Sequence, residues 1–488
     1  MKVELQFPCT LFNFTEEKPV YKIEDKNQIK IIDFIMPFGG KLSPENRWIK
    51  LSKEVPWDKI EEKYSCLFGE TGNVAKPCRM ALGALLIQEK LKITDEETLN
   101  QITENPYLQY FIGLTEYTAK PPFTAPLMVS FRKRFTKEIL AEINEDVFIR
   151  KNDKDDDNED PPSNKGTLIV DATCTPSDIA YPTDHDLLNE ARGNTEKIID
   201  TLHKTDKGKV LKPRTYRQQA RKKYLSIAKK RKNTKKALRK GIKQQLGYIK
   251  RNLKTIDKMI EKYGLKVLPN RQNKLLETIK TLYEQQKYMF DNKVHTVDNR
   301  IVNLYQPHVR PIVRGKAKAS VEFGAKVAVS LVNGYSFVDE ISWNNFNEGS
   351  ELIEVIESYR DKFGYYPVEI LADKLYRNTK NIEFCKKNGI RLSGPKLGRP
   401  GKNHKEELRQ ERNDTKARNQ VEGKFGEGKR KYGLALIMTK LKETSETVIS
   451  LKFLIMNFER RLRFLLHFLL YLEIPCFLIH SFAAFAVI

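Results

Sequence analysis

Three carboxylates far apart in the chain are candidates for phosphoryl chemistry. Asp171 ends the apolar, β-branched run TLIVDAT, Asp373 ends YPVEILAD, and Glu422 lies in the predicted helix of RNQVEGKFGEGKRKYGL. Functional residues collect at strand ends in a mixed sheet. Carboxylates brought together there repel one another unless cations neutralise them, and hard oxygen ligands suit Mg²⁺ or Mn²⁺. Two such ions can activate an attacking oxygen and stabilise a leaving one at a phosphodiester.

Acidity alone does not single out these three residues. Asp178, Asp184 and Asp186 lie close to Asp171, and structural acids outnumber catalytic ones. The three candidates are favoured by their positions in the order of strands and by the residues around Glu422.

Two cations accompany Glu422 at helical spacing. Arg418 is four residues before it and therefore on the same face of a helix, and Lys429 is seven residues after it, two turns on. A metal-binding carboxylate flanked by two cations would hold phosphates beside the metals. The alternative is an ordinary ladder of surface salt bridges.

The elements around these residues predict a mixed sheet with helices on its faces. After the first strand and a long helical insertion, the residues predict β, β, α, β, α, β, α. Asn333-Gly334, between two β-rich runs, is a strong hairpin signal. The predicted elements that follow the insertion are strands at 320–332 and 335–343, a helix at 349–364, a strand at 366–373, a helix at 377–389, a strand at 390–394 and a helix from about 406.

The insertion holds most of the net charge of this 488-residue chain. Residues 204–258 contain 22 Lys and Arg against two acids, a net +20, which leaves +4 for the rest of the total of +24. Such density favours binding to nucleic acid, because contact with phosphates releases condensed counterions, over a merely solvated helical face. We expect DNA contacts from Lys222, Lys223, Lys229, Lys230, Arg231, Lys232, Lys235, Lys236, Arg239 and Lys240.

An apolar stripe runs through the same segment and predicts a helical hairpin. One face carries Leu238, Ile242, Leu246, Ile249, Leu253, Ile256 and Ile260. Gly264 and Pro269-Asn270 then break the helix, and a second stripe carries Leu275, Ile279, Leu282 and Met289.

The remaining segments complete the domain plan. Residues 1–150 are predicted to be helical, either a helix-turn-helix DNA reader or a bundle for packing and self-association. The acidic stretch 151–166 suits a linker. The predicted catalytic domain comprises 167–200 and 300–461, and the basic helical insertion comprises 201–299.

Composition excludes several classes of protein. With 40% hydrophobic and 31% charged residues, the chain is neither disordered nor collagenous. Its six cysteines form no CxxC pair, which argues against a zinc ribbon and for a reducing compartment. The N-terminus shows no pattern of a signal peptide, and we expect a cytoplasmic, nucleoid-associated protein.

These motifs together resemble the DDE-class transposases of bacterial insertion sequences, of the insertion-sequence-five group. The resemblance runs from residue 39 to about 461, through LIVDATCTPSDIAYPTD, VRGKAKASVEFGAKV, ADKLYRNTKN and RNQVEGKFGEGKRKYGL. The signature Tyr-x2-Arg-x3-Glu-x6-Lys is matched by Arg418, Glu422 and Lys429, whereas Thr415 stands in the tyrosine position. That substitution puts one supporting DNA contact in doubt.

The resemblance implies a ribonuclease-H-like catalytic domain in which Asp171, Asp373 and Glu422 hold Mg²⁺ or Mn²⁺. It implies hydrolysis at each transposon end, attack of the freed 3′ hydroxyl on target DNA, double-stranded DNA as partner, and a homo-multimer on paired ends. We expect no small-molecule cofactor. Further DNA contacts are expected from Tyr376 and Arg377 beside Asp373, and from Lys396 and Arg399 in a basic loop.

Two alternative functions remain open on the sequence. One is a ribonuclease-H-like nuclease that cuts without joining, and the other is an inactive transposase remnant that only binds DNA. The hydrophobic tail, 462–488, is a separate question. Glu473 and Pro475 divide it into segments too short to span a bilayer, so we favour a packed helix, a dimer contact or an out-of-frame extension over a membrane anchor.

Overall fold

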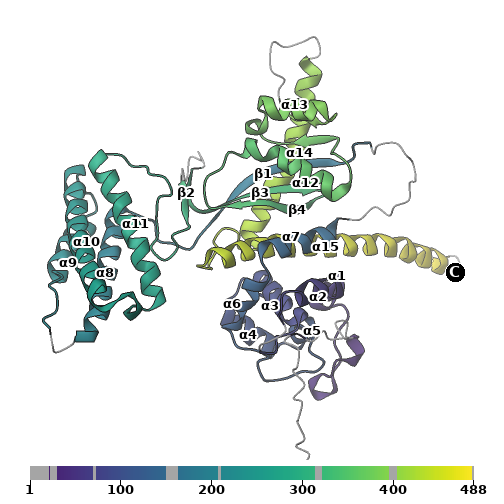
Figure 1. The fold of residues 1–488 in the computed structure, drawn as a ribbon. Coiled ribbons are helices and arrows are strands. Elements are labelled where there is room, and N and C mark those ends of the chain that lie inside the picture. The colour runs from purple at the N-terminus through teal and green to yellow at the C-terminus, as the bar shows by residue number, and fades with distance from the viewer. Residues whose placement is uncertain are drawn as a thin grey trace, which may run out of the picture. The chain divides into compact units, whose positions relative to one another are not determined.

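The computed structural model (Figure 1) describes residues 21, 30–69, 73–149, 163–206, 210–313, 321–394 and 404–485, with the backbone alone beyond residue 464. It divides into two compact units, residues 1–143 with 457–488 and residues 144–456. Two helices, α7 (Lys137–Phe148) and α15 (Lys442–Phe485), have residues in both units. Most of the predicted acidic linker, residues 151–162, lies outside the described residues.

Among its described residues, the first unit is mostly helical from Arg47 on, as the sequence predicts for residues 1–150. One of its helices begins at a capped residue, since the Thr94 hydroxyl accepts a hydrogen bond from the Glu97 amide at 3.2 Å. Trp57 and Phe111 are fully buried and pack edge to face in its core. The helices before α7 are α1 (Arg47–Glu54), α2 (Trp57–Ser65), α3 (Cys78–Leu91), α4 (Asp95–Glu104), α5 (Pro106–Phe111) and α6 (Leu127–Arg134).

The second unit contains a six-stranded mixed sheet. Its strands are β1 (Thr167–Pro176), β2 (Arg310–Val313), β3 (Val321–Val332), β4 (Tyr335–Ser342), β5 (Glu369–Leu371) and β6 (Arg391–Leu392). The order is β2-β3-β1-β5-β6, with β4 paired to β3. β3 runs antiparallel to β1, β2 and β4, whereas β5 is parallel to β1 and to β6.

The predicted hairpin and the predicted mixed α/β class are both confirmed. Asn333 and Gly334 join β3 to β4, and both have positive φ, 53° and 81°. That conformation is the one in which Asn-Gly turns match the twist of the strands they join. β2, a short strand at one edge of the sheet, has no counterpart among the predicted elements, and β5 has only three residues where the sequence predicts a strand at 366–373.

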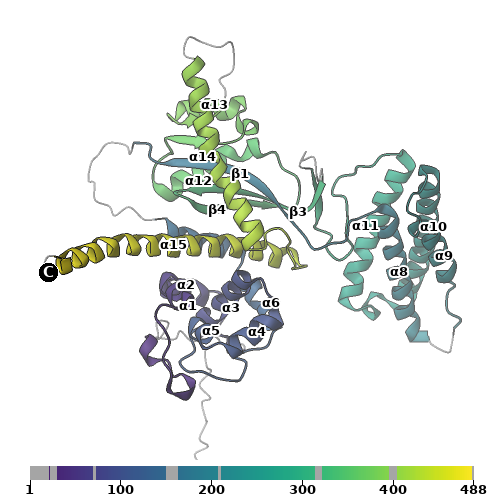
Figure 2. The same ribbon diagram turned by 180° about the vertical axis from the view of Figure 1, so that it is seen from behind.

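Helices cover both faces of the sheet (Figures 1 and 2). α12 (Glu348–Phe363) and α13 (Thr379–Lys387) pack over one face, where Leu168, Val170 and Ile370 meet Leu352 and Ile356 of α12. α14 (His404–Lys431) contacts β1 and β5, and it crosses the opposite face in Figure 2. Alternate residues of β1 therefore point towards different helices.

The basic insertion is a helical bundle and not the predicted two-helix hairpin. Within the described residues, α8 (Asp184–His203) and α9 (Arg217–Ala228) join α10 (Lys235–Tyr263) and α11 (Asn270–Asn292). The predicted break is confirmed, since α10 ends before Gly264 and α11 begins after Pro269. The predicted boundary at residue 201 falls inside α8.

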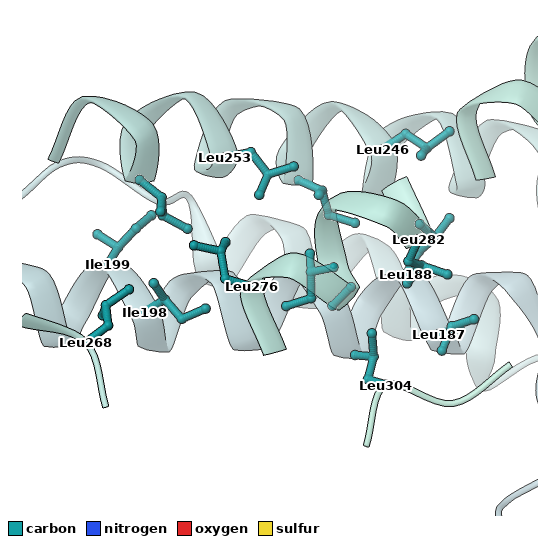
Figure 3. Packing of buried hydrophobic residues seen from close by; sticks show 14 of the residues in the cluster. Leu187, Leu188, Ile198, Ile199, Leu246, Leu253, Leu268, Leu276, Leu282 and Leu304 are labelled. Carbon is teal, nitrogen blue, oxygen red and sulfur yellow. The ribbon is translucent and has the colours of Figure 1, made fainter. Parts of the chain in front are cut away.

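One apolar core holds this bundle together (Figure 3). Leu246 and Leu253 of the first predicted stripe and Leu282 of the second pack against Leu188 and Ile199 of α8. Leu238, at the start of the first stripe, is exposed. α8 belongs to this bundle, although most of its residues fall within the predicted catalytic segment 167–200.

Among the described residues, no helix has both the length and the apolar character needed to span a membrane. The side chains of the hydrophobic tail from residue 465 on lie outside those residues.

Candidate active site

Asp171 lies on β1, the strand between β3 and β5. Its Oδ1 accepts a hydrogen bond from the backbone amide of Ala172 at 2.8 Å. Burial raises the pKa of Asp171 to about 6, and the charges of Glu348 and Asp373 add to this effect, whereas the Ala172 amide and Arg418 oppose it. Asp171 is therefore a carboxylate in an acidic, half-buried setting that a cation would favour.

Asp373 is brought beside Asp171 by the register of two parallel strands. Ile169 of β1 is paired with Leu371, the last residue of β5, and each acid lies two residues further along the chain. Asp373 lies two residues beyond β5 and caps the short 3-10 turn η5 (Lys374–Tyr376), accepting a hydrogen bond from the Lys374 amide at 2.6 Å. Its side chain is about half exposed (47%).

Arg418 connects the second and third acids. On α14, its Nη1 lies 3.0 Å from Asp373 Oδ1 and its Nη2 lies 3.9 Å from Glu422 Oε1. Val421, next to Glu422, is fully buried, whereas the Glu422 side chain is 59% exposed. The apolar face of α14 therefore packs against the sheet, and Arg418 and Glu422 lie near the end of β5.

The three acids are of the chemical type that binds hard metal ions. In this structure the Arg418 guanidinium supplies positive charge beside Asp373 and Glu422. Among the described residues, no group of three or more His, Cys, Asp or Glu is close enough to hold a metal ion. The burial and neighbouring acids that raise the pKa of Asp171, and the contact of Arg418 with Asp373, both indicate a site that favours positive charge. Carboxylate oxygens are ligands for Mg²⁺ and Mn²⁺.

Two families of known proteins match the chain. The family described as Transposase DDE domain matches residues 370–459, which include Asp373, Arg418 and Glu422. The family described as Transposase domain (DUF772) matches residues 37–134, in the first unit. The chain is related to the DDE-class transposases.

One curated relative matches a smaller part of the chain. "Uncharacterized protein ORF8 in nfe locus" of Rhizobium meliloti is 26% identical over 153 residues, which cover 31% of this chain and 71% of that protein. No solved structure gives a significant match.

Glu348 of this chain is a further acid close to Asp171, and it is not among the residues predicted from the sequence. It begins α12, and its Oε1 lies 2.8 Å from Nζ of Lys326 on β3. Lys326 Nζ also donates to the carbonyl of Phe346 at 2.8 Å. Glu348 is close to Asp171 only because of tertiary packing. In the sequence it resembles any acid in the first turn of a helix.

Tyr376 and Arg377, both predicted to contact DNA, are engaged within the protein. Tyr376 is 4% exposed and packs in the core under α12, and burial raises its pKa well above the usual range, helped by Glu348 and Asp171. Arg377 Nη1 donates to the carbonyl of Leu392 at 2.8 Å. A DNA contact by either side chain requires this packing to open, and the prediction stays untested.

The other predicted contacts near the acids fall into two groups. Lys429 is half-buried on α14, two turns beyond Glu422. Lys396 and Arg399 lie outside the described residues.

The basic residues of the insertion lie on the outside of the bundle, on α9, the first half of α10 and the turn between them. We name this set the basic surface. Its members, all exposed, are Lys222, Lys223, Lys229, Lys230, Arg231, Lys232, Lys235, Lys236, Arg239 and Lys240. Arg239 is held in place, since its Nη2 donates to the carbonyl of Phe290 at 2.9 Å and its guanidinium lies over the Phe290 ring.

Proposed function

We propose that this protein is a DNA transposase that cuts and joins DNA with Asp171, Asp373 and Glu422. The observation that carries the proposal is the meeting of two acids from separate elements on Arg418, with Asp171 close enough for its pKa to respond to both Asp373 and Arg418. The matches to transposase families at both ends of the chain support it.

The order of strands supports a ribonuclease-H-like catalytic domain. Along the path β4-β3-β1-β5-β6, the first three strands pair antiparallel and the last two are parallel to β1. Asp171 lies on the central strand and Asp373 follows its parallel neighbour, as expected for functional residues near a change in strand order.

In the proposed reaction Asp171, Asp373 and Glu422 hold Mg²⁺ or Mn²⁺. Such ions, when bound, supply activation of water and neutralisation of charge at a phosphodiester. Water attacks the phosphodiester at a transposon end, which releases a 3′ hydroxyl on one side and a 5′ phosphate on the other. The 3′ hydroxyl then attacks a phosphodiester of target DNA, forming one P–O bond and breaking another, so that no bond to the protein is needed.

Arg418 has a second role once cations are present. Its planar guanidinium suits two oxygens of a phosphate, as it suits two carboxylates. We infer that it exchanges Asp373 and Glu422 for the DNA backbone at the site of cleavage.

The basic surface supplies affinity for DNA that is independent of sequence. Its ten cations lie on a bundle with its own core, so they can contact phosphates away from the acids. A homo-multimer on paired DNA ends, located with the nucleoid, completes the proposal.

Cleavage of DNA that carries the ends flanking the reading frame tests the proposal. Asp171→Asn and Asp373→Asn are expected to bind these ends and not to cut them in Mg²⁺. Asp178→Asn is the matched control, because this exposed acid lies seven residues from Asp171. Cleavage by either variant at the normal rate would refute the assignment. Joining of pre-cut ends to target DNA distinguishes a transposase from a nuclease that only cuts.

A further inference from the structure

An ion-pair network connects the three elements that bear the acids. Arg391 on β6 is paired in register with Glu369 on β5, and its Nε lies 3.1 Å from Glu369 Oε2. Thr167 of β1 donates to the other oxygen of Glu369 at 2.8 Å. Asp171 is four residues beyond Thr167 on the same strand, so the network starts on the strand of the first acid.

The same arginine holds α14. Arg391 Nη1 lies 2.8 Å from Asp414 Oδ2, and Arg391 Nη2 lies 3.0 Å from Asp414 Oδ1. This two-bond geometry fixes orientation as well as distance. Asp414 is 8% exposed, and Gln410, one turn earlier on the same helix, also donates to it at 2.9 Å, so its carboxylate is held by both the sheet and α14.

Asp414 lies on the same face of α14 as the two candidate site residues of that helix. Asp414, Arg418 and Glu422 are four residues apart in turn and therefore share one face of α14. The bond to Arg391 sets both the rotation of this face and its height above β5, where Arg418 meets Asp373 at 3.0 Å.

We propose that Arg391 is a positioning residue for catalysis, which holds Arg418 and Glu422 in register with Asp171 and Asp373 through Asp414. The inference rests on the proposed function and adds a residue that does not touch the reacting atoms. Lysine cannot replace this arginine, since a single ammonium does not reproduce two parallel bonds. A small misplacement of a metal-binding carboxylate costs about 10- to 100-fold in activity or metal affinity.

Arg391→Lys and Asp414→Asn in the full-length protein test the inference. Each is expected to lower the maximal rate of DNA-end cleavage by about 10- to 100-fold and to raise the Mg²⁺ concentration for half-maximal rate. The affinity for DNA ends is expected to change much less, since most of it comes from the basic surface. Asp414→Asn keeps the shape of the side chain and guards against a loss of folding. Arg360→Lys is the control, since Arg360 pairs with Glu357 at 2.9 Å on α12 with similar exposure.

The outcomes separate the two proposals. If the wild-type protein does not cleave, the proposed function fails. If the wild type cleaves and both variants show its Mg²⁺ dependence, Arg391 does not position the site. A variant that only unfolds more easily would lose active molecules without a change in the Mg²⁺ concentration for half-maximal rate, and that result also refutes the inference.

Discussion

Replacing Asp171 by asparagine is expected to stabilise the protein while it abolishes cleavage. Burial of the carboxylate raises its pKa from 3.8 to about 6, and the charges of Glu348 and Asp373 add to this effect. In the wild-type protein the Ala172 amide donates to Asp171 at 2.8 Å. The asparagine side chain has the same shape, so it keeps this hydrogen bond and removes the negative charge. Its NH₂ group also gains acidic neighbours as acceptors.

The size of the effect follows from the pKa. The pKa of Asp171 is about two units higher in the folded protein than in the unfolded chain. Ionisation of the carboxylate therefore destabilises the folded protein by at most about 3 kcal/mol. The sign is opposite to that of an acid in a salt bridge: stability is lost as pH rises from about 4, where the unfolded chain ionises, through about 6, where the folded protein does. The penalty is then complete at pH 8 and roughly half as large at pH 5.

Thermal melting of the two proteins at pH 8 and pH 5, without divalent metal, measures this difference. Asp171→Asn is expected to melt on the order of 5 °C higher than wild type at pH 8, with a smaller gap at pH 5. Added Mg²⁺ is expected to close the gap at pH 8, because a ligand that binds the folded carboxylates stabilises the wild type more.

Asp361→Asn is the control, since the Asp361 side chain is 72% exposed. A lower melting temperature for Asp171→Asn at pH 8, or a gap of equal size at both pH values, would show that the Asp171 carboxylate is not in an unfavourable setting. Burial and the neighbouring acids would then not disfavour the charge of Asp171.

Three other predictions concern the neighbouring acid, the basic surface and a helix cap. Glu348→Gln removes one charge that raises the pKa of Asp171, so the acid limb of the cleavage rate against pH is expected to shift to lower pH; an unshifted profile would contradict this. Changing the four exposed cations at residues 229–232 to glutamine is expected to reduce the slope of log affinity for DNA against log salt by up to about 3.6. An unchanged slope would show that these cations do not contact DNA phosphates. Thr94→Ala removes the cap on Glu97 and is expected to cost about 1 kcal/mol in urea unfolding of the first unit; no change in midpoint would argue against the cap.

The local elements of the fold could be predicted because their signals lie within a few residues. Asn333-Gly334 requires the positive φ values that it adopts, and Gly264 and Pro269 end and start helices for reasons of backbone geometry. The strands that bear Asp171 and Asp373 were recognisable from their β-branched residues and their order.

The parts that could not be predicted depend on register and packing. Asp171 and Asp373 are neighbours because Ile169 pairs with Leu371, and no local pattern encodes that pairing. Glu348 and Arg391 are acidic and basic residues of common kinds until tertiary structure places them beside Asp171 and Asp414. The bundle was mistaken for a hairpin because a stripe of apolar residues does not reveal how many helices will cover it.

The central claim is that Asp171, Asp373 and Glu422 form one metal-dependent site for cutting DNA. The most direct measurement is end cleavage in Mg²⁺ by wild type, Asp171→Asn, Asp373→Asn and Glu422→Gln, on DNA that carries the sequences flanking the reading frame. We predict a new 3′ hydroxyl at the transposon end with the wild type alone, and equal binding of that DNA by all four proteins. Cleavage at the wild-type rate by any of the three variants would contradict the account.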